Sequence, residues 1–221
     1  MDNTKTTIGP VHMRTLLRVV LGVAVVEILV RVIFRHGTDY SMSIWGVSRF
    51  LEGVLMIVLL FFGKQGLSAV GLTKRSAVSG LWRGVLWSAG FGGIVLLVFG
   101  ALAAMGIDPL LFIKTPLPFD MGRLILFLLV GGVVSPITEE LFFRGVLYGF
   151  MRRWGVTGAV VLSSLLFVCA HHIALTRFSW IPLMGGVVFA LAYEMEQNLL
   201  VPITLHVSGN MAIFVLSALY P

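Results

Sequence analysis

Residues 135–145, SPITEELFFRG, decide how the rest of the chain is interpreted, because two adjacent acids and an arginine lie here between long apolar runs. An ionised side chain at membrane depth is costly and marks a functional site by default. We therefore start from the hypothesis that this stretch carries the catalytic base of an enzyme that works inside a membrane. The remaining sequence has to supply the partners of that base.

The composition is that of a membrane protein. Of the 221 residues, 58% are hydrophobic and 12% are charged, and the mean hydropathy is +1.00. A soluble domain has about 45–50% apolar and about 25% charged residues. The apolar runs are continuous, whereas an outer-membrane barrel would alternate apolar and polar residues. The bases behind the net charge of +6 lie mostly at the ends of these runs, as membrane anchors do, so we expect no nucleic-acid partner.

The predicted fold class is an all-α polytopic membrane protein, a bundle of about seven to eight transmembrane helices with a buried polar active-site cavity. Pro136 is expected to kink or break the long fourth span, which would make the following segment a separate helical piece. In the third span, Gly90, Gly92, Gly93 and Gly100 are expected to allow close helix packing. The seven predicted spans are 14–34, 44–63, 82–106, 122–150, 156–172, 180–195 and 198–219.

Residues 107–121, IDPLLFIKTPLPFDM, divide the chain into two parts. Three prolines and charges of both signs are typical of an interfacial linker. We predict a first domain, 1–119, that contains the N-terminal transmembrane helices and this linker. The second domain, 120–221, is predicted to be the catalytic helical core, because it holds nearly all the candidate chemistry.

Three separate apolar spans each carry a polar group that we expect at a similar depth. If Gly155 is a turn, Glu139 and His171 both lie sixteen residues from it. His206 and Asn210 lie one helical turn apart on one face of the last span. A turn before that span brings them within a turn or two of the same depth. We predict that these four residues form the catalytic site.

The two acids of the first motif have different roles by helical geometry. Glu140 and Arg144 are four residues apart and can form an ion pair, which predicts structural support. Glu139 points about 100° away from Glu140 and is left without a same-helix partner. We therefore expect Glu139 to be the chemical group.

Two chemistries fit this set of residues. In the first, Glu139 and His171 position and deprotonate a water molecule, while His206 and Asn210 donate hydrogen bonds to the developing oxyanion. In the second, Glu139, His171 and His206 bind a zinc ion that activates the water. The His-Glu-x-x-His zinc signature is absent from the sequence. A third interpretation is a polar cluster that only holds the helices together.

Three ordered motifs carry a family resemblance: Glu139-Glu140-x-x-x-Arg144, Phe167-x-x-x-His171 and His206-x-x-x-Asn210. Together they resemble the CAAX protease and bacteriocin-processing family. Its members are intramembrane endopeptidases, also called the abortive-infection or type II CAAX prenyl endopeptidase group. The resemblance covers about residues 120–215.

The resemblance implies peptide-bond hydrolysis in a cavity open to the membrane interface, with Glu139 activating water beside His171. It implies that His206 and Asn210 form the oxyanion site, and that the second acid and the arginine of the first motif support the architecture. The family has been described both as metalloproteases and as glutamate-dependent proteases. We favour a site without a metal cofactor, because Asn210 resembles a second oxyanion donor; zinc is the alternative.

The expected substrate is a membrane-associated protein or peptide, and the expected surroundings are the lipid bilayer. The short chain resembles a prokaryotic member of the family, so we expect an integral, multi-pass protein of a prokaryotic plasma (inner) membrane. By resemblance, such members are linked to peptide or bacteriocin maturation, to self-immunity and to processing of membrane-anchored proteins. The alternative is a non-enzymatic immunity or scaffold protein that binds a peptide partner through the same cavity.

Overall fold

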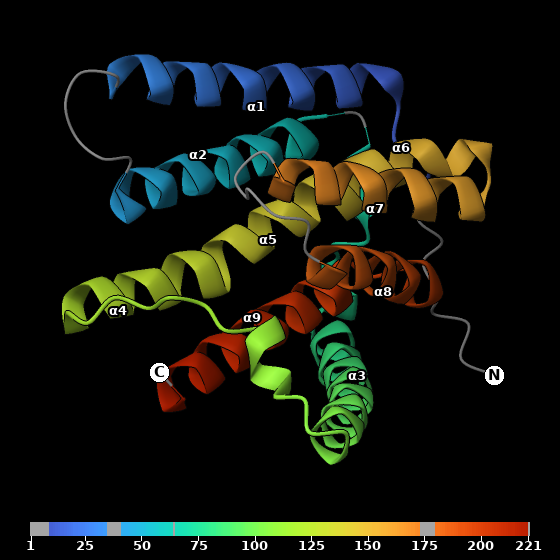
Figure 1. Cartoon of the computed structure of the whole chain (residues 1–221). Coiled ribbons are helices and arrows are strands. Elements are labelled where there is room, and N and C mark those ends of the chain that lie inside the picture. The colour runs from blue at the N-terminus through green and yellow to red at the C-terminus, as the bar shows by residue number, and fades with distance from the viewer. Residues whose placement is uncertain (1–8, 35–40, 64, 173–179, 221) are drawn as a thin grey trace.

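The computed structural model describes residues 9–34, 41–63, 65–172 and 180–220. These residues form helices and connecting turns, and no strand occurs among them (Figure 1). Within these described ranges, seven continuous helical runs correspond to the seven predicted spans. Their bounds are Met13–Ile33 (α1), Met42–Phe61 (α2), Ala77–Ala104 (α3), a central run that contains α4, α5 and α6, Val156–His172 (α7), Trp180–Glu196 (α8) and Leu200–Leu219 (α9).

The all-helical membrane fold class is confirmed. Within the described ranges, four helices are long and apolar enough to cross a membrane: Met42–Phe61, Leu67–Ala104, Met121–Trp154 and Leu200–Leu219. The other three predicted spans do not meet this standard. Helix α1 carries four charged residues, Arg14, Arg18, Glu27 and Arg31, and α7 and α8 have 17 residues each. A helix of that length measures about 25 Å, which is less than the bilayer core of about 30 Å.

The central run does not break at Pro136. It continues from α4 (Met121–Leu129) through a π-helical segment, η4 (Val130–Val134), into α5 (Ser135–Glu140). A second π-helical segment, η5 (Leu141–Tyr148), leads on to α6 (Gly149–Met151). Proline lacks an N–H and crowds the carbonyl four residues before it. The wider π turn before Pro136 accommodates both effects, so the predicted break is wrong, while the predicted kink stays a prediction.

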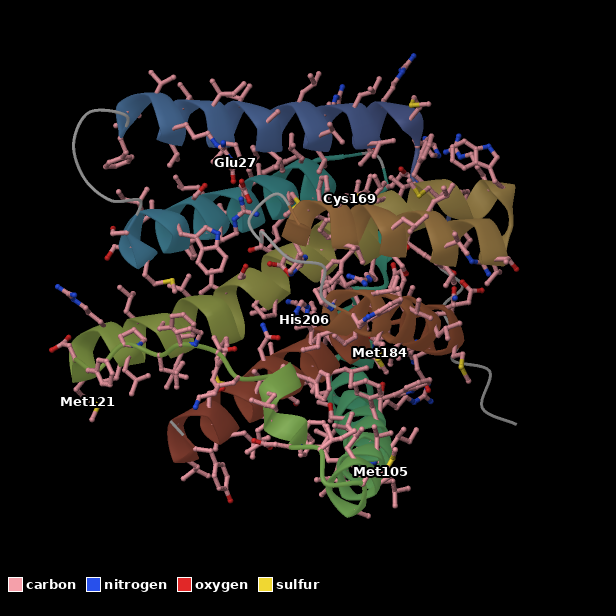
Figure 2. All side chains as sticks on the ribbon, viewed as in Figure 1. Glu27, Met105, Met121, Cys169, Met184 and His206 are labelled. Carbon is pink, nitrogen blue, oxygen red and sulfur yellow. The ribbon has the colours of Figure 1, made fainter. Side chains whose placement is uncertain are left out.

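The other helices surround the central run. Helix α1 lies beside α2, α7 beside α8, and α3 beside α9, while α2, α7, α8 and α9 contact the central run (Figure 1). Glu27 of α1 lies between α1 and α2, and it shares Arg49 of α2 with Glu52 (Figure 2). Elements from before and after residue 120 thus pack together, and the division into two domains at that point stays a prediction.

Helix α2 makes a close contact with the residue that precedes Glu139. A Cβ atom on Gly53 would lie 3.0 Å from the Thr138 hydroxyl, so the glycine allows the two helices to touch. That hydroxyl donates a hydrogen bond of 2.9 Å to the carbonyl of Arg49. The N-terminal half of the chain therefore fixes the position of the central run next to the candidate site.

Helix α3 packs on α9 through Gly84 and on the turn before α9 through Gly80, four residues earlier. A Cβ atom on Gly84 would lie 2.5 Å from Cβ of Thr204, and one on Gly80 would overlap the Asn198 amide. Small residues at this spacing let two helices approach closely in lipid. The prediction that four other glycines do so is wrong, because a Cβ would meet no atom within 4 Å at Gly90, Gly92, Gly93 or Gly100.

The α3–α9 contact gives a prediction with a matched control. Gly84→Ala should lower the free energy of unfolding by about 1–3 kcal/mol, because the added methyl overlaps Thr204. Gly93→Ala should leave it unchanged or raise it by up to about 1 kcal/mol, since only helix propensity changes there. Denaturant titration of both variants in detergent micelles measures the difference. Equal effects of the two substitutions would contradict the observed contact.

Candidate active site

Three of the four predicted catalytic residues meet at the centre of the bundle, where Figure 2 labels His206. Glu139 comes from α5, His171 from the end of α7 and His206 from α9. Oε2 of Glu139 lies 3.7 Å from Nε2 of His171 and 3.9 Å from Nε2 of His206. Gly155, with φ of 100°, forms the turn between the central run and α7 on which the predicted depth of His171 depends.

Both histidines use Nδ1 for a contact away from Glu139. Nδ1 of His171 lies 2.9 Å from the carbonyl oxygen of Phe167, which can only accept, so this nitrogen carries the proton. Nδ1 of His206 lies 2.8 Å from Oε1 of Glu140 and donates to it when that carboxylate is ionised. In the neutral form of each ring, Nε2 then presents its lone pair to Glu139.

Glu140 and Arg144 form the predicted ion pair, and both side chains are fully buried. Nη1 of Arg144 donates to Oε1 of Glu140 at 2.9 Å, and Nη2 donates to the carbonyl of Gly186 on α8 at 3.0 Å. The same oxygen of Glu140 also contacts His206. The pair therefore supports the architecture and fixes the orientation of one candidate catalytic ring.

Glu139 has a same-helix partner, contrary to the sequence analysis. The hydroxyl of Ser135 donates to Oε1 of Glu139 at 2.6 Å. Ser135 lies four residues before Glu139, so the spacing rule that identified the Glu140–Arg144 pair could have identified this one too. One oxygen of Glu139 is thus held by its own helix, and the other faces the two histidines.

Asn210 contacts a backbone carbonyl of the central run. Its Nδ2 donates to the carbonyl of Gly131 at 2.9 Å. In the π segment, the N–H of Ser135 bonds the carbonyl of Val130, five residues back. The next N–H in this register would come from Pro136 and serve Gly131, but proline has none. Asn210 therefore satisfies the carbonyl that Pro136 leaves without a donor, and its second amide hydrogen is available for another contact.

Aromatic rings surround the polar cluster. Phe189 of α8 stacks on the His206 ring, with centroids 4.6 Å apart at 26°, and Phe167 lies 4.3 Å from the His171 ring. The Arg144 guanidinium lies 4.5 Å from the centroid of Phe167 and 5.3 Å from that of Phe189. A buried charge above ring faces is stabilised by the ring quadrupole. The sequence analysis missed Phe189, because no motif spacing links it to His206.

The donor atoms are of the kinds that bind zinc, and they lie slightly farther apart than the ligands of a zinc ion do. Zinc is commonly bound by a carboxylate and by imidazole Nε2 atoms of rings whose Nδ1 atoms form hydrogen bonds to other groups. Tetrahedral zinc with bonds of about 2.0–2.1 Å brings its ligand atoms to roughly 3.4 Å from one another. The two separations measured here are longer, and no group of three His, Cys, Asp or Glu side chains in the described part of the chain is arranged to hold a metal.

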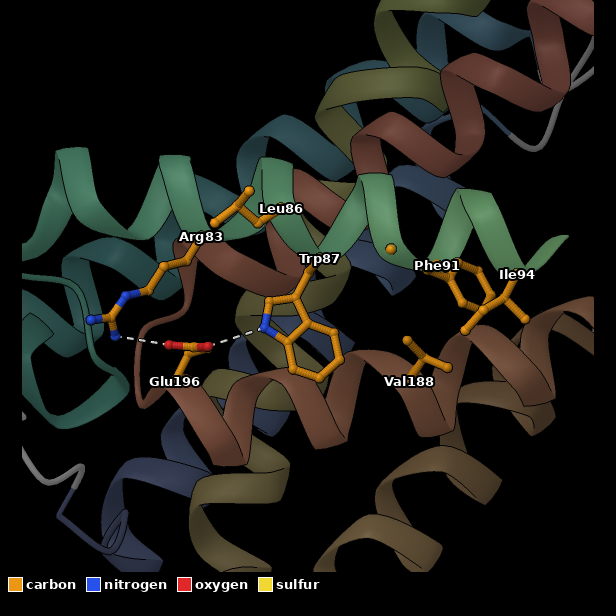
Figure 3. A pocket seen from close by; sticks show the side chains of 8 residues that line it. Arg83, Leu86, Trp87, Phe91, Ile94, Val188 and Glu196 are labelled. Carbon is orange, nitrogen blue, oxygen red and sulfur yellow. Dashed lines mark hydrogen bonds and ion pairs between the residues drawn. The ribbon is translucent and has the colours of Figure 1, made fainter. Parts of the chain in front are cut away.

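A cleft of about 460 Å³ lies between α3 and α8 rather than around Glu139 (Figure 3). Its lining includes none of the four predicted catalytic residues. The predicted polar cavity around the catalytic cluster therefore stays a prediction.

Comparison with known proteins confirms the resemblance. Residues 121–212 match the family described as type II CAAX prenyl endopeptidase Rce1-like. The chain is 31% identical over 105 residues to the membrane-embedded CAAX protease MroQ of Staphylococcus aureus (strain USA300); the aligned segment covers 43% of this chain and 41% of that protein. The chain is 28% identical over 137 residues to an uncharacterized 24.3 kDa protein of Escherichia coli, and this segment covers 58% of this chain and 61% of that protein.

A third relative is the putative membrane peptidase YdiL of Bacillus subtilis (strain 168), which is 23% identical over 180 residues. The aligned segment covers 77% of this chain and 70% of that protein. The chain spans less than two thirds of the length of the first two relatives. No solved structure matches the chain significantly.

The buried ion pair gives a stability prediction. Arg144→Met should lower the free energy of unfolding by about 3–5 kcal/mol, because it leaves the Glu140 charge buried without its partner. Adding Glu140→Gln to that variant should restore most of the loss, since the unpaired charge is then removed. The free energies of unfolding of the two single variants and the double variant in detergent give the coupling energy between Glu140 and Arg144. If the losses of the two single variants simply add in the double variant, the predicted coupling is contradicted.

Proposed function

We propose that this chain, whose residues 121–212 belong to the Rce1-like CAAX protease family, is a membrane-embedded endopeptidase that cleaves a membrane-associated protein or peptide. One observation carries the proposal: the Glu139 carboxylate lies within 4 Å of Nε2 of His171 and of Nε2 of His206 inside an apolar helical bundle. The names of two bacterial relatives, a CAAX protease and a putative membrane peptidase, agree with it.

Glu139 is the proposed general base. The 3.7 Å between its Oε2 and Nε2 of His171 is too long for a direct hydrogen bond and suits one water between the two atoms. The Phe167 carbonyl holds His171 with its Nε2 lone pair towards that water, which it orients by accepting one hydrogen bond. As the water oxygen attacks the peptide carbonyl carbon, Glu139 takes the other proton. It then gives this proton to the leaving amine nitrogen when the C–N bond breaks.

His206 and Asn210 are the proposed oxyanion donors. Because Nδ1 of His206 already donates to Glu140, His206 can donate from Nε2 only when the ring carries a second proton. The ionised Glu140 carboxylate on Nδ1 stabilises that charged ring. Asn210 supplies its second amide hydrogen, while the first one holds Gly131. Such donors are most effective when they are fixed before the charge develops, as these two are.

The membrane provides the remaining condition for catalysis. We infer a multi-pass protein of a bacterial plasma membrane, since four helices are long enough to span and the relatives are bacterial. An apolar surrounding excludes bulk water, which strengthens the electrostatic contacts of the site. The substrate class that fits is therefore a peptide segment held at or in the bilayer.

The proposal is tested with Glu139→Gln, which keeps the shape of the side chain and removes the base. Membranes from bacterial cells that produce the wild type or the variant are compared by mass spectrometry of labelled peptide termini. Termini generated by the wild type should fall about 10²–10⁴-fold in the variant. Asp108→Asn is the matched control, because it makes the same change at an exposed helix cap and should leave the termini unchanged.

Peptides that span the mapped cleavage points are then incubated with purified protein in detergent. Cleavage by the wild type and not by Glu139→Gln supports the endopeptidase. If both proteins give the same termini and neither cleaves the peptides, the chain is not a protease of this type, and the non-enzymatic immunity or scaffold function is favoured instead.

The metal-free chemistry has its own test. Cleavage of these peptides by the purified wild type should persist within about two-fold after dialysis against a strong chelator, since no step proposed here uses a metal. Metal analysis of the same sample should give far less than one zinc per chain. Loss of cleavage with the chelator, followed by recovery when zinc is added, would assign Glu139, His171 and His206 as zinc ligands.

A further inference from the structure

The cleft between α3 and α8 is lined by none of the four predicted catalytic residues and has a polar end and an apolar body (Figure 3). At the polar end, Arg83 forms an ion pair with Glu196 at 2.8 Å, and the indole N–H of Trp87 donates to the same carboxylate at 3.1 Å. The body of the cleft is formed by the apolar residues Leu86, Phe91, Ile94 and Val188, with Gly90 among them.

We propose that this cleft is a binding site for one acyl chain of an anionic membrane phospholipid, with the headgroup at Arg83. The inference does not rest on the proposed protease activity. It rests on the length, volume, polarity and charge of the cleft.

The length of the cleft fits one leaflet of a bilayer. Arg83 and Ile94 are eleven residues apart on one helix, which corresponds to about 16 Å. Half of a hydrocarbon core of about 30 Å is about 15 Å. A tail that starts at Arg83 therefore reaches the middle of the membrane near Ile94.

The volume and polarity exclude the other membrane occupants. A helix about 10 Å wide and 16 Å long would occupy about 1,300 Å³, almost three times the 460 Å³ of the cleft. An extended peptide would need hydrogen-bond partners for its backbone along its whole length. Beyond Trp87, the cleft lining from Gly90 to Ile94 and at Val188 presents apolar side chains. A single hydrocarbon chain needs no such partners.

The charges at the polar end favour an anionic headgroup. Lys74 and Arg75 are exposed on the 3₁₀ turn Lys74–Ser76 that leads directly into α3, about two turns before Arg83. Glu196 is the single acid of the lining. The Arg83 side chain is 42% exposed beside it, so part of the guanidinium remains open to a phosphate. Basic clusters next to a span attract anionic lipids, and tryptophan is typical of the interface.

The test uses native mass spectrometry of the full chain in detergent, titrated with phosphatidylglycerol or phosphatidylcholine that carry the same acyl chains. The wild type should retain one phosphatidylglycerol at least about three-fold more strongly than one phosphatidylcholine, and Arg83→Gln should remove that preference. Gly90→Phe should lower retention of the first lipid at least about five-fold, because the ring fills the cleft.

Gly100→Phe is the matched control, because it adds the same ring to the same helix at another exposed glycine that does not line the cleft. It should change lipid retention less than about two-fold. Equal retention by the two phenylalanine variants would overturn the site. So would equal retention of the two lipids by the wild type, or displacement of the bound lipid by an equimolar transmembrane helical peptide, which would assign the cleft to a helix.

Discussion

The contact on which the rest of the site depends is the carboxylate oxygen Oε1 of Glu140, which Arg144 and His206 share. Arg144 has no exposed surface, so its charge has to be balanced within the protein. Through Gly186 the same guanidinium also holds α8. One buried charge cluster therefore joins the central run, α8 and α9, and it orients the His206 ring towards Glu139. Local packing around the cluster is aromatic, which keeps these charges away from water and from lipid.

The π-helical segments explain how the central run can carry Pro136 and the site together. The segment before Pro136 leaves the carbonyl of Gly131 without a helical donor, and Asn210 of α9 provides one. A residue predicted only as an oxyanion donor thus also holds two helices in register. Replacing Asn210 is therefore costly for structural reasons alone, whatever its part in the proposed chemistry.

Much of the fold and part of the site could be predicted from the sequence. Helical runs followed from apolar length, and the equal distance of Glu139 and His171 from Gly155 indicated that they meet. The Glu140–Arg144 pair followed from a spacing of four. Contacts across the bundle could not be predicted, because Phe189 and His206, or Gly84 and Thr204, are related only by tertiary packing. The π-helical segments could not be predicted either. Pro136 is the one residue that indicates an irregular helix there, and it is equally compatible with a break.

The charge balance of the cluster bears on the choice between the two chemistries. The cluster contains two carboxylates, those of Glu139 and Glu140, and one guanidinium, that of Arg144. Uncompensated charge at that depth is costly. The oxyanion chemistry requires a second proton on His206, because Nδ1 already donates to Glu140 and Nε2 has to donate as well. The same protonation removes the lone pair that a zinc ion would need. The proton on Nε2 of His206 thus distinguishes the proposed oxyanion mechanism from the zinc alternative.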